Sequence, residues 1–145
     1  MNRCAWPSGS TKRKTPWGHE ISWEGIFYGK EIFIKSGNRT SLKFNEQKNE
    51  MLYVQAGKVH VEYADEGHFR DPAGYPSCTR VLQPGDCLNI QTGCPYRLSA
   101  LEDSTVFEIS NNTLSKHRVI IEDDYGRDTS GAKNKNLIFN PSKEH

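Results

Sequence analysis

Residues 37–57 read GNRTSLKFNEQKNEMLYVQAG, and the pattern of this stretch decides the predicted fold. Over residues 40–45, apolar and polar side chains alternate with a period of two, as in a β-strand with two unlike faces. Leu42 and Phe44 share one face, and Ser41, Lys43 and Asn45 share the other. Residues 50–55 continue the alternation and end near Gly57, which turns the chain into residues 58–63. The stretch therefore predicts three short strands joined by turns.

Strand-like segments rich in aromatic and β-branched residues recur along the rest of the chain. They cover residues 27–35, 81–86, 88–90, 96–100, 105–110 and 118–122. Glycine and proline punctuate the intervals between them, and no segment of convincing length has the period of a helix. About eight to ten short strands with frequent turns predict an all-β sandwich or small barrel.

Composition divides the chain into three parts. Residues 1–15 are rich in serine, lysine and arginine and predict a flexible N-terminal arm. Residues 16–127 carry the strands of the barrel, and residues 128–145 form a polar C-terminal tail in which residues 137–139 are expected to dock on the body. Residues 64–80 contain glycine and proline without periodicity and predict a long surface loop. The sequence leaves open whether this loop caps the barrel mouth.

Composition also bears on the class of function. The net charge of +1 provides no field that would recruit nucleic acid. No apolar run approaches the length of a membrane span or a secretory signal, so a cytoplasmic protein is expected. The four cysteines include no C-x2-C pair and are expected to be free thiols in a reducing compartment.

The spacing of residues 37–57 resembles the first motif of the cupins, G-x5-H-x-H-x3,4-E-x6-G. Its glycines match at both ends and its glutamate matches Glu50, whereas Lys43 and Asn45 stand at the two histidine positions. The second cupin motif, G-x5-P-x-G-x2-H-x3-N, lies over residues 85–100 with both glycines matching and Tyr96 at the histidine position. The resemblance implies a cupin fold, which is a jelly-roll barrel or double-stranded β-helix.

Within the cupins, the chain resembles the barrel of the type II mannose-6-phosphate isomerases, also found at the C-terminus of mannose-1-phosphate guanylyltransferases. Residues 16–18 match the Pro-Trp-Gly of that family, and residues 122–127 match its E-D-x-Y-G-R ending. The family arginine two residues before that glutamate is Ile120 here, with Arg118 nearby. The resemblance covers residues 16–127 and implies a homodimer in carbohydrate metabolism that acts on, or binds, a sugar phosphate.

The departures from the family fall on the metal ligands. The inner quartet of the family is Gln, His, Glu and His, and the matching residues are Lys43, Asn45, Glu50 and Tyr96. A cationic ammonium opposes a bound cation, and imidazoles are the usual ligands of transition metals. We therefore expect no metal and no other cofactor. Lys43 is expected to replace the charge of the metal, to pair with Glu50 across the barrel and to lower the pKa of that carboxyl.

Three readings of the site stay open. In the first, Lys43 is the electrophile, Glu50 carries the proton and Tyr96 assists, in a sugar-phosphate isomerase. A nucleotide-sugar epimerase would instead use a histidine base, and His60 is a candidate whose strand face the sequence does not settle. In the others, the barrel is a non-catalytic carbohydrate-binding module, or a structural and assembly module with a buried Lys43–Glu50 pair. The candidate ligand-binding residues are Ser41, Asn45, His60 and three arginines, Arg39, Arg97 and Arg127, which would hold a phosphate or, alternatively, lie in solvent.

Overall fold

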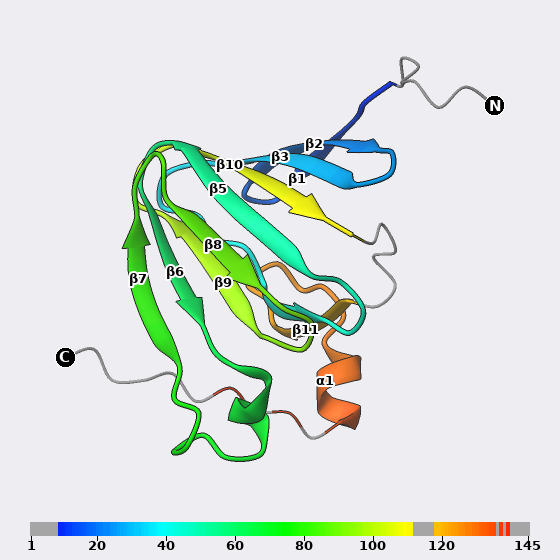
Figure 1. Cartoon of the computed structure of the whole chain (residues 1–145), viewed down its shortest axis with the longest axis vertical. Helices are drawn as coiled ribbons and strands as arrows, with labels where there is room; N and C mark the ends of the chain where they lie inside the picture. The colour runs from blue at the N-terminus through cyan, green and yellow to red at the C-terminus, as the bar shows by residue number, and fades with distance from the viewer. Residues whose placement is uncertain (1–8, 112–117, 136, 138, 140–145) are drawn as a thin grey trace.

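The computed structural model describes residues 9–111, 118–135, 137 and 139, which form two antiparallel sheets and a short C-terminal helix (Figure 1). The six-stranded sheet has the order β1 (Thr11–Thr15), β2 (Gly18–Glu24), β3 (Tyr28–Ile34), β10 (Ser104–Ser110), β5 (Glu50–Ala56) and β8 (Cys87–Ile90). The five-stranded sheet has the order β11 (Arg118–Glu122), β4 (Leu42–Asn45), β9 (Tyr96–Ala100), β6 (Val59–Tyr63) and β7 (Cys78–Leu82). The predicted all-β jelly-roll architecture is confirmed.

The inner faces of the two sheets enclose one apolar core. Its members come from both sheets and include Ile32, Ile34, Leu52, Val54, Val59, Val61, Leu98 and Val106. Because Val59 and Val61 are fully buried here, the alternating residue His60 lies on the outer face of β6. Polar residues replace apolar ones toward the end of the barrel where β5 begins, and this end holds the candidate site.

The outer face of the five-stranded sheet is also buried at β4 and β11, because the C-terminal segment covers it there. Leu42 packs in one cluster with Phe139, and Phe44 packs in another with Ala132 and Leu137. The predicted docking of residues 137–139 is confirmed for Leu137 and Phe139, and residue 138 lies outside the described residues. The apolar face of β4 therefore points outward under this cover, and its polar face points into the barrel.

The structure corrects the sequence prediction in two segments. Residues 11–15, predicted as part of a flexible arm, form β1 and pair with β2, while residues 1–8 lie outside the described residues. Residues 64–80, predicted as loop, contain the 3-10 helix η1 (Glu66–Phe69) and the start of β7. His68 of η1 is fully buried, and the centre of its ring lies 4.8 Å from that of Phe139 in a tilted arrangement. This segment therefore packs on the body instead of lying free in solvent.

Helical structure is sparse, as the sequence predicted. The helix α1 (Ser130–Asn134) is only five residues long and contacts β11. None of the described helices has the length and apolar character needed to cross a membrane. The strands are thus the elements that position the site.

Candidate functional site

The four positions that match the cupin metal ligands meet at one end of the barrel. Lys43 and Asn45 come from β4, Glu50 from the start of β5 and Tyr96 from the start of β9, where Tyr96 is the register partner of Lys43. Asn45 Nδ2 donates a hydrogen bond to Glu50 Oε1 at 2.5 Å, and Tyr96 Oη donates one to Glu50 Oε2 at 2.8 Å. Asn45, Glu50 and Tyr96 are buried, and Lys43 is half-buried. Both oxygens of Glu50 therefore have protein donors.

Glu108 and Lys48 complete this group, and the sequence analysis missed both. Glu108 lies on β10 with only 2% of its surface exposed, and Lys48 lies in the turn between β4 and β5. Lys48 Nζ is 3.1 Å from Glu108 Oε2 and 3.9 Å from Glu50 Oε1. The signal for Glu108 was available, because it alternates in phase with the core residue Val106 and a strand glutamate in that phase must point inward. We call Lys43, Asn45, Lys48, Glu50, Tyr96 and Glu108 the inner cluster.

The two carboxyls of the inner cluster have pKa values displaced in opposite directions. Burial, the charge of Glu108 and a hydrogen bond with Glu108 raise the pKa of Glu50 to about 7. Burial opposes ionisation of Glu108 as well, but the hydrogen bond with Glu50 and the nearby lysines outweigh it and lower the pKa of Glu108 to about 2. Two carboxyls this close share one proton, so the pair carries a single negative charge over the acid range.

The predicted ion pair between Lys43 and Glu50 does not form. Lys43 Nζ instead lies 5.3 Å from the centre of the Tyr96 ring, and the ammonium nearest Glu50 is that of Lys48. Burial lowers the pKa of Lys43 to about 8, although the charge of Glu50 opposes this change. The charge of Lys43 does lower the pKa of Glu50 as expected, but burial and Glu108 outweigh it, so that the net shift is upward.

Cations outnumber carboxylates around the inner cluster. Apart from Arg127, which is paired with Asp123, the interacting cations are Arg13, Lys30, Lys43, Lys48 and Arg118, and the carboxylates are Glu20, Glu50 and Glu108. Five cations against three carboxylates leave an excess of two positive charges even when every carboxyl is ionised. This end of the barrel therefore has an electrostatic preference for an anionic ligand.

Lys43 and Arg118 contribute most to that preference. Arg118 is the register partner of Asn45, and Ile120 is the partner of Lys43, so Arg118 lies on the same inward face as both. Neither Lys43 nor Arg118 forms an ion pair with a carboxylate of the described residues, whereas Lys30 and Lys48 both do. Burial and then the charges of Arg127 and Arg13 lower the pKa of Arg118, as expected where cations are gathered without enough anions.

The inner cluster does not fit a transition metal. Asn45 and Tyr96 turn their hydrogen atoms toward Glu50, and the ammonium groups of Lys43 and Lys48 occupy the same end of the barrel. No three His, Cys, Asp or Glu side chains within the described part of the chain gather as a metal site. The donor set at these four positions holds one carboxylate and no imidazole, which is a poor set for such an ion.

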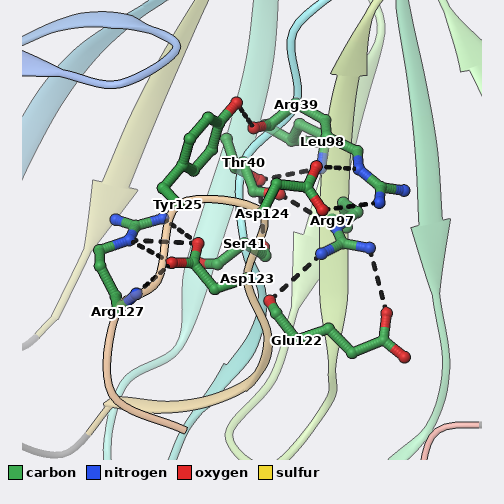
Figure 2. Close-up of polar contacts among 10 residues, drawn as sticks. All are labelled: Arg39, Thr40, Ser41, Arg97, Leu98, Glu122, Asp123, Asp124, Tyr125 and Arg127. Carbon is green, nitrogen blue, oxygen red and sulfur yellow. Dashed lines mark hydrogen bonds and ion pairs between the residues drawn. The ribbon is translucent and has the colours of Figure 1, made fainter.

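The three arginines predicted to hold a phosphate lie apart from the inner cluster and have carboxylate partners of their own (Figure 2). Arg39 forms a two-point ion pair with Asp124 at 2.6 and 2.8 Å, and Arg127 pairs with Asp123 at 2.8 Å. Arg97, which alternates with Tyr96 and so faces outward, donates to the Thr40 carbonyl and to two oxygens of Glu122. The three acidic partners are consecutive residues of the 122–127 motif, which therefore fastens the end of β11 to β9 and to residues 39–40.

The remaining predicted ligand residues are also outside the inner cluster. Ser41 is buried beside Thr40, whose hydroxyl donates to the Ser41 carbonyl, within the region shown in Figure 2. His60 pairs in register with Ser99 and Val81 on the outer face of the five-stranded sheet. Of the predicted catalytic and ligand residues, the structure thus brings together Lys43, Asn45, Glu50 and Tyr96.

Two open clefts lie along the edge where β7 and β8 leave the sheets unclosed. One has a volume of about 490 Å³ and is lined by Tyr63, Arg80 and residues 86–88 among others. The second, of about 450 Å³, is lined by Tyr63, Tyr75, Ile90 and Cys94 among others. Ile90 is the register partner of Glu50, and Tyr63 is the partner of Tyr96, so the second cleft adjoins the end of the barrel that holds the inner cluster.

Comparison with solved structures identifies proteins of similar fold. No family model and no curated protein matches the sequence. Among solved structures, the capsular polysaccharide assembling protein CapF from Staphylococcus aureus matches with a TM-score of 0.67 at 12% identity, over 81% of this chain and 33% of that chain. The formate complex of Lactobacillus farciminis oxalate decarboxylase matches with a TM-score of 0.64 at 17% identity, over 89% of this chain and 39% of that chain. KdgF from Halomonas sp. matches with a TM-score of 0.59 at 19% identity, over 73% of this chain and 89% of that chain.

These similarities show that the chain has the cupin fold, as the motif spacing predicted. Identities this low carry the fold and not the reaction. The chain spans well under half the length of the CapF and oxalate decarboxylase chains. The finer resemblance to mannose-6-phosphate isomerases stays a prediction.

Proposed function

We propose that this cupin-fold protein binds an anionic carbohydrate, a sugar phosphate, at the inner cluster and isomerises it by metal-independent proton transfer. The observation that carries the proposal is the hydrogen-bonded pair of Glu50 and Glu108, whose pKa values of about 7 and about 2 differ widely. A pair of titratable groups with separated pKa values is a common arrangement in acid–base catalysis. A carboxyl with a pKa of about 7 can both accept and return a proton at neutral pH.

The proposed roles follow from position and charge. Lys43 and Arg118 are the inward cations without a carboxylate partner among the described residues, and they would bind the anionic oxygens of the ligand. Ionised Glu50 would remove the proton from the hydroxyl-bearing carbon next to the carbonyl and return it to the carbonyl carbon. The hydroxyl proton would move to the former carbonyl oxygen, so that atoms and charge balance. The ammonium of Lys43 would stabilise the enediolate oxygen formed between these two steps. Tyr96 would hold the Glu50 carboxyl in place through its hydrogen bond.

A second candidate is a non-catalytic module for carbohydrate binding or assembly. The observation in its favour is that Asn45, Tyr96 and Lys48 already satisfy both oxygens of Glu50. A fully satisfied buried polar network gives rigidity and needs no ligand. The similarity to CapF, a capsular polysaccharide assembling protein, agrees with either candidate because it rests on the fold alone.

Thermal melting with a chelator present tests the binding step. Mannose 6-phosphate at ten times its dissociation constant would stabilise the folded chain by about 1.4 kcal/mol, which raises Tm by about 4 °C for a domain of this size. Lys43→Gln and Arg118→Gln should each abolish this rise, and Lys35→Gln should keep it because Lys35 is exposed outside the barrel. If sugar phosphates, free mannose and inorganic phosphate all leave Tm unchanged, the proposal is wrong.

Deuterium exchange tests the chemical step. In heavy water, the wild-type protein should incorporate deuterium at the carbon next to the carbonyl of the bound sugar phosphate, as followed by proton NMR. Glu50→Gln should remove this exchange while the Tm rise persists, because the amide keeps the shape but cannot accept the proton. Binding without exchange in the wild-type protein would favour the non-catalytic module.

A further inference from the structure

The second cleft, on the open edge between β7 and β8, borders the inner cluster along two strands. Ile90 and Tyr63 line this cleft, and their register partners are Glu50 and Tyr96. Register partners on antiparallel strands carry their side chains on the same face, with Cα atoms only about 4.5–5.5 Å apart. The inner wall of the cleft is therefore one strand away from both Glu50 and Tyr96.

Tyr75 forms a fixed aromatic wall of this cleft. One face of its ring lies on the backbone of η1, because a Cβ on Gly67 would be only 2.7 Å from Tyr75 Cδ2. The Tyr75 carbonyl accepts a hydrogen bond from the buried His68 Nδ1 at 2.7 Å, and the Tyr75 N–H donates to the Asp71 carbonyl at 2.9 Å. Tyr75 is nevertheless 45% exposed. The other face of a firmly held ring is thus open to a ligand.

The second cleft differs from the inner cluster in charge. Asp65 is the one charged residue among the described residues that line the cleft, and its carboxylate already accepts the Gly67 N–H at 2.8 Å as the cap of η1. The inner cluster, by contrast, has an excess of cations. A ligand that spans both would place its anionic group at the inner cluster and an uncharged part in the cleft.

We propose that the second cleft is a subsite for a neutral sugar unit, so that the protein acts on an oligosaccharide whose reducing-end unit carries the phosphate. This inference rests on the proposed function, because the reducing-end unit with its free carbonyl occupies the inner cluster. One face of a pyranose ring presents C–H groups, which pack on the electron-rich face of an aromatic ring such as that of Tyr75. Asn89 and Gln91 also line the cleft, and amides pair with sugar hydroxyls.

Other extensions of the ligand suit the cleft less well. The diphosphate of a nucleotide sugar would need cations there. Arg80 is the one cation among the described residues that line the neighbouring first cleft, and it donates to Tyr63 Oη at 3.1 Å. An acyl chain would cover the Asp65 carboxylate without giving it a polar partner. The cleft volume of about 450 Å³ lies within the range of about 300–1,000 Å³ for small-molecule sites.

A disaccharide with a phosphate on its reducing-end mannose tests the proposal directly. In isothermal titration of the full chain, this compound should bind at least about 10-fold more tightly than mannose 6-phosphate, because it also covers the Tyr75 ring. Tyr75→Ala should remove this gain and leave the affinity for mannose 6-phosphate unchanged, whereas Tyr75→Phe should keep the gain. Tyr53→Ala is the matched control, because Tyr53 is 43% exposed but lies on the outer face of β5. This control should also keep the gain.

Neutral mannobiose tests the cleft without the phosphate. In proton–nitrogen NMR spectra of the wild-type protein it should shift the amide signals of residues 63–65, 74–78 and 89–95, which needs no variant to fold. If mannose 6-phosphate binds but the disaccharide phosphate binds no more tightly, the subsite is wrong and the proposed function stands. If mannobiose shifts the cleft signals while no sugar phosphate binds, the proposed function fails and the cleft alone remains a sugar site. Mannobiose without effect on the cleft, or displaced from it by uridine or an octyl chain, would overturn the inference.

Discussion

Replacing Glu50 by glutamine should remove a pH dependence of stability that the buried carboxyl pair creates. The pKa of Glu50 is about 7 in the folded protein and 4.5 in its ordinary state, so the folded protein keeps a proton that the unfolded chain loses above pH 4.5. The free energy of unfolding must therefore fall as pH rises from 4.5 to about 7. Glutamine resembles the protonated carboxyl and does not titrate, so the variant lacks this fall.

The magnitude follows from the same pKa values. A difference of one in pKa is worth about 1.4 kcal/mol, so the step from 4.5 to about 7 corresponds to about 3 kcal/mol. The pKa of Glu108 is about 2, so its favourable contribution is complete above pH 4.5 and is constant across this window. Lys43, with a pKa of about 8, stays protonated in both states over the same window. The carboxyl pair therefore sets the expected slope at this site.

Urea unfolding at several pH values between 4.5 and 7 measures this effect. The unfolding free energy of Glu50→Gln minus that of the wild type should rise by about 3 kcal/mol across the window, because all other titrating groups are common to both proteins. Glu102→Gln is the control, since Glu102 is exposed in the turn before β10 and its profile should follow the wild type. A wild-type stability that is level or rises with pH relative to Glu50→Gln would refute the buried, proton-sharing pair.

Two pairs of substitutions and one single substitution test the framework around the site. Arg97→Ala should cost about 3 kcal/mol in urea unfolding, because it removes the donor to the buried Thr40 carbonyl and to the part-buried Glu122 carbonyl. Arg39→Ala removes an exposed pair and should cost under about 1 kcal/mol. Gly57→Ala should cost about 3 kcal/mol, since φ is +88° and a Cβ would lie 2.4 Å from a backbone oxygen. Gly85→Ala should cost about 1 kcal/mol, because φ is +97° there but the space around the Cβ is open. Equal losses within either pair would contradict this reasoning. Phe139→Ala should lower Tm, cost about 3 kcal/mol and increase binding of a hydrophobic dye; an unchanged Tm would show that the C-terminal cover does not stabilise the sheet.

Period-two alternation and motif spacing were enough to predict the cupin fold and the strands from β3 onward, but not β1 and β2. They also predicted that Lys43, Asn45, Glu50 and Tyr96 would meet, because the matching glycines fix where strands turn and alternation fixes which side chains share a face. The error at residues 11–15 has a local cause. The run Thr-Lys-Arg-Lys-Thr holds no apolar side chain and resembles a flexible arm until a partner strand supplies its hydrogen bonds.

The tertiary structure alone decided which face of each strand is the inside and which charges meet. An apolar strand face is ordinarily expected to point into the barrel. In β4 it points outward instead, where the C-terminal segment covers it. Lys48 meets Glu108 across 60 residues, and Arg39 meets Asp124 across 85. Such pairings depend on how distant strands are ordered in a sheet, and the sequence near either partner holds no trace of the other. The pKa of Glu50 is raised for the same reason, because burial and a distant carboxylate act on it only once the barrel has closed.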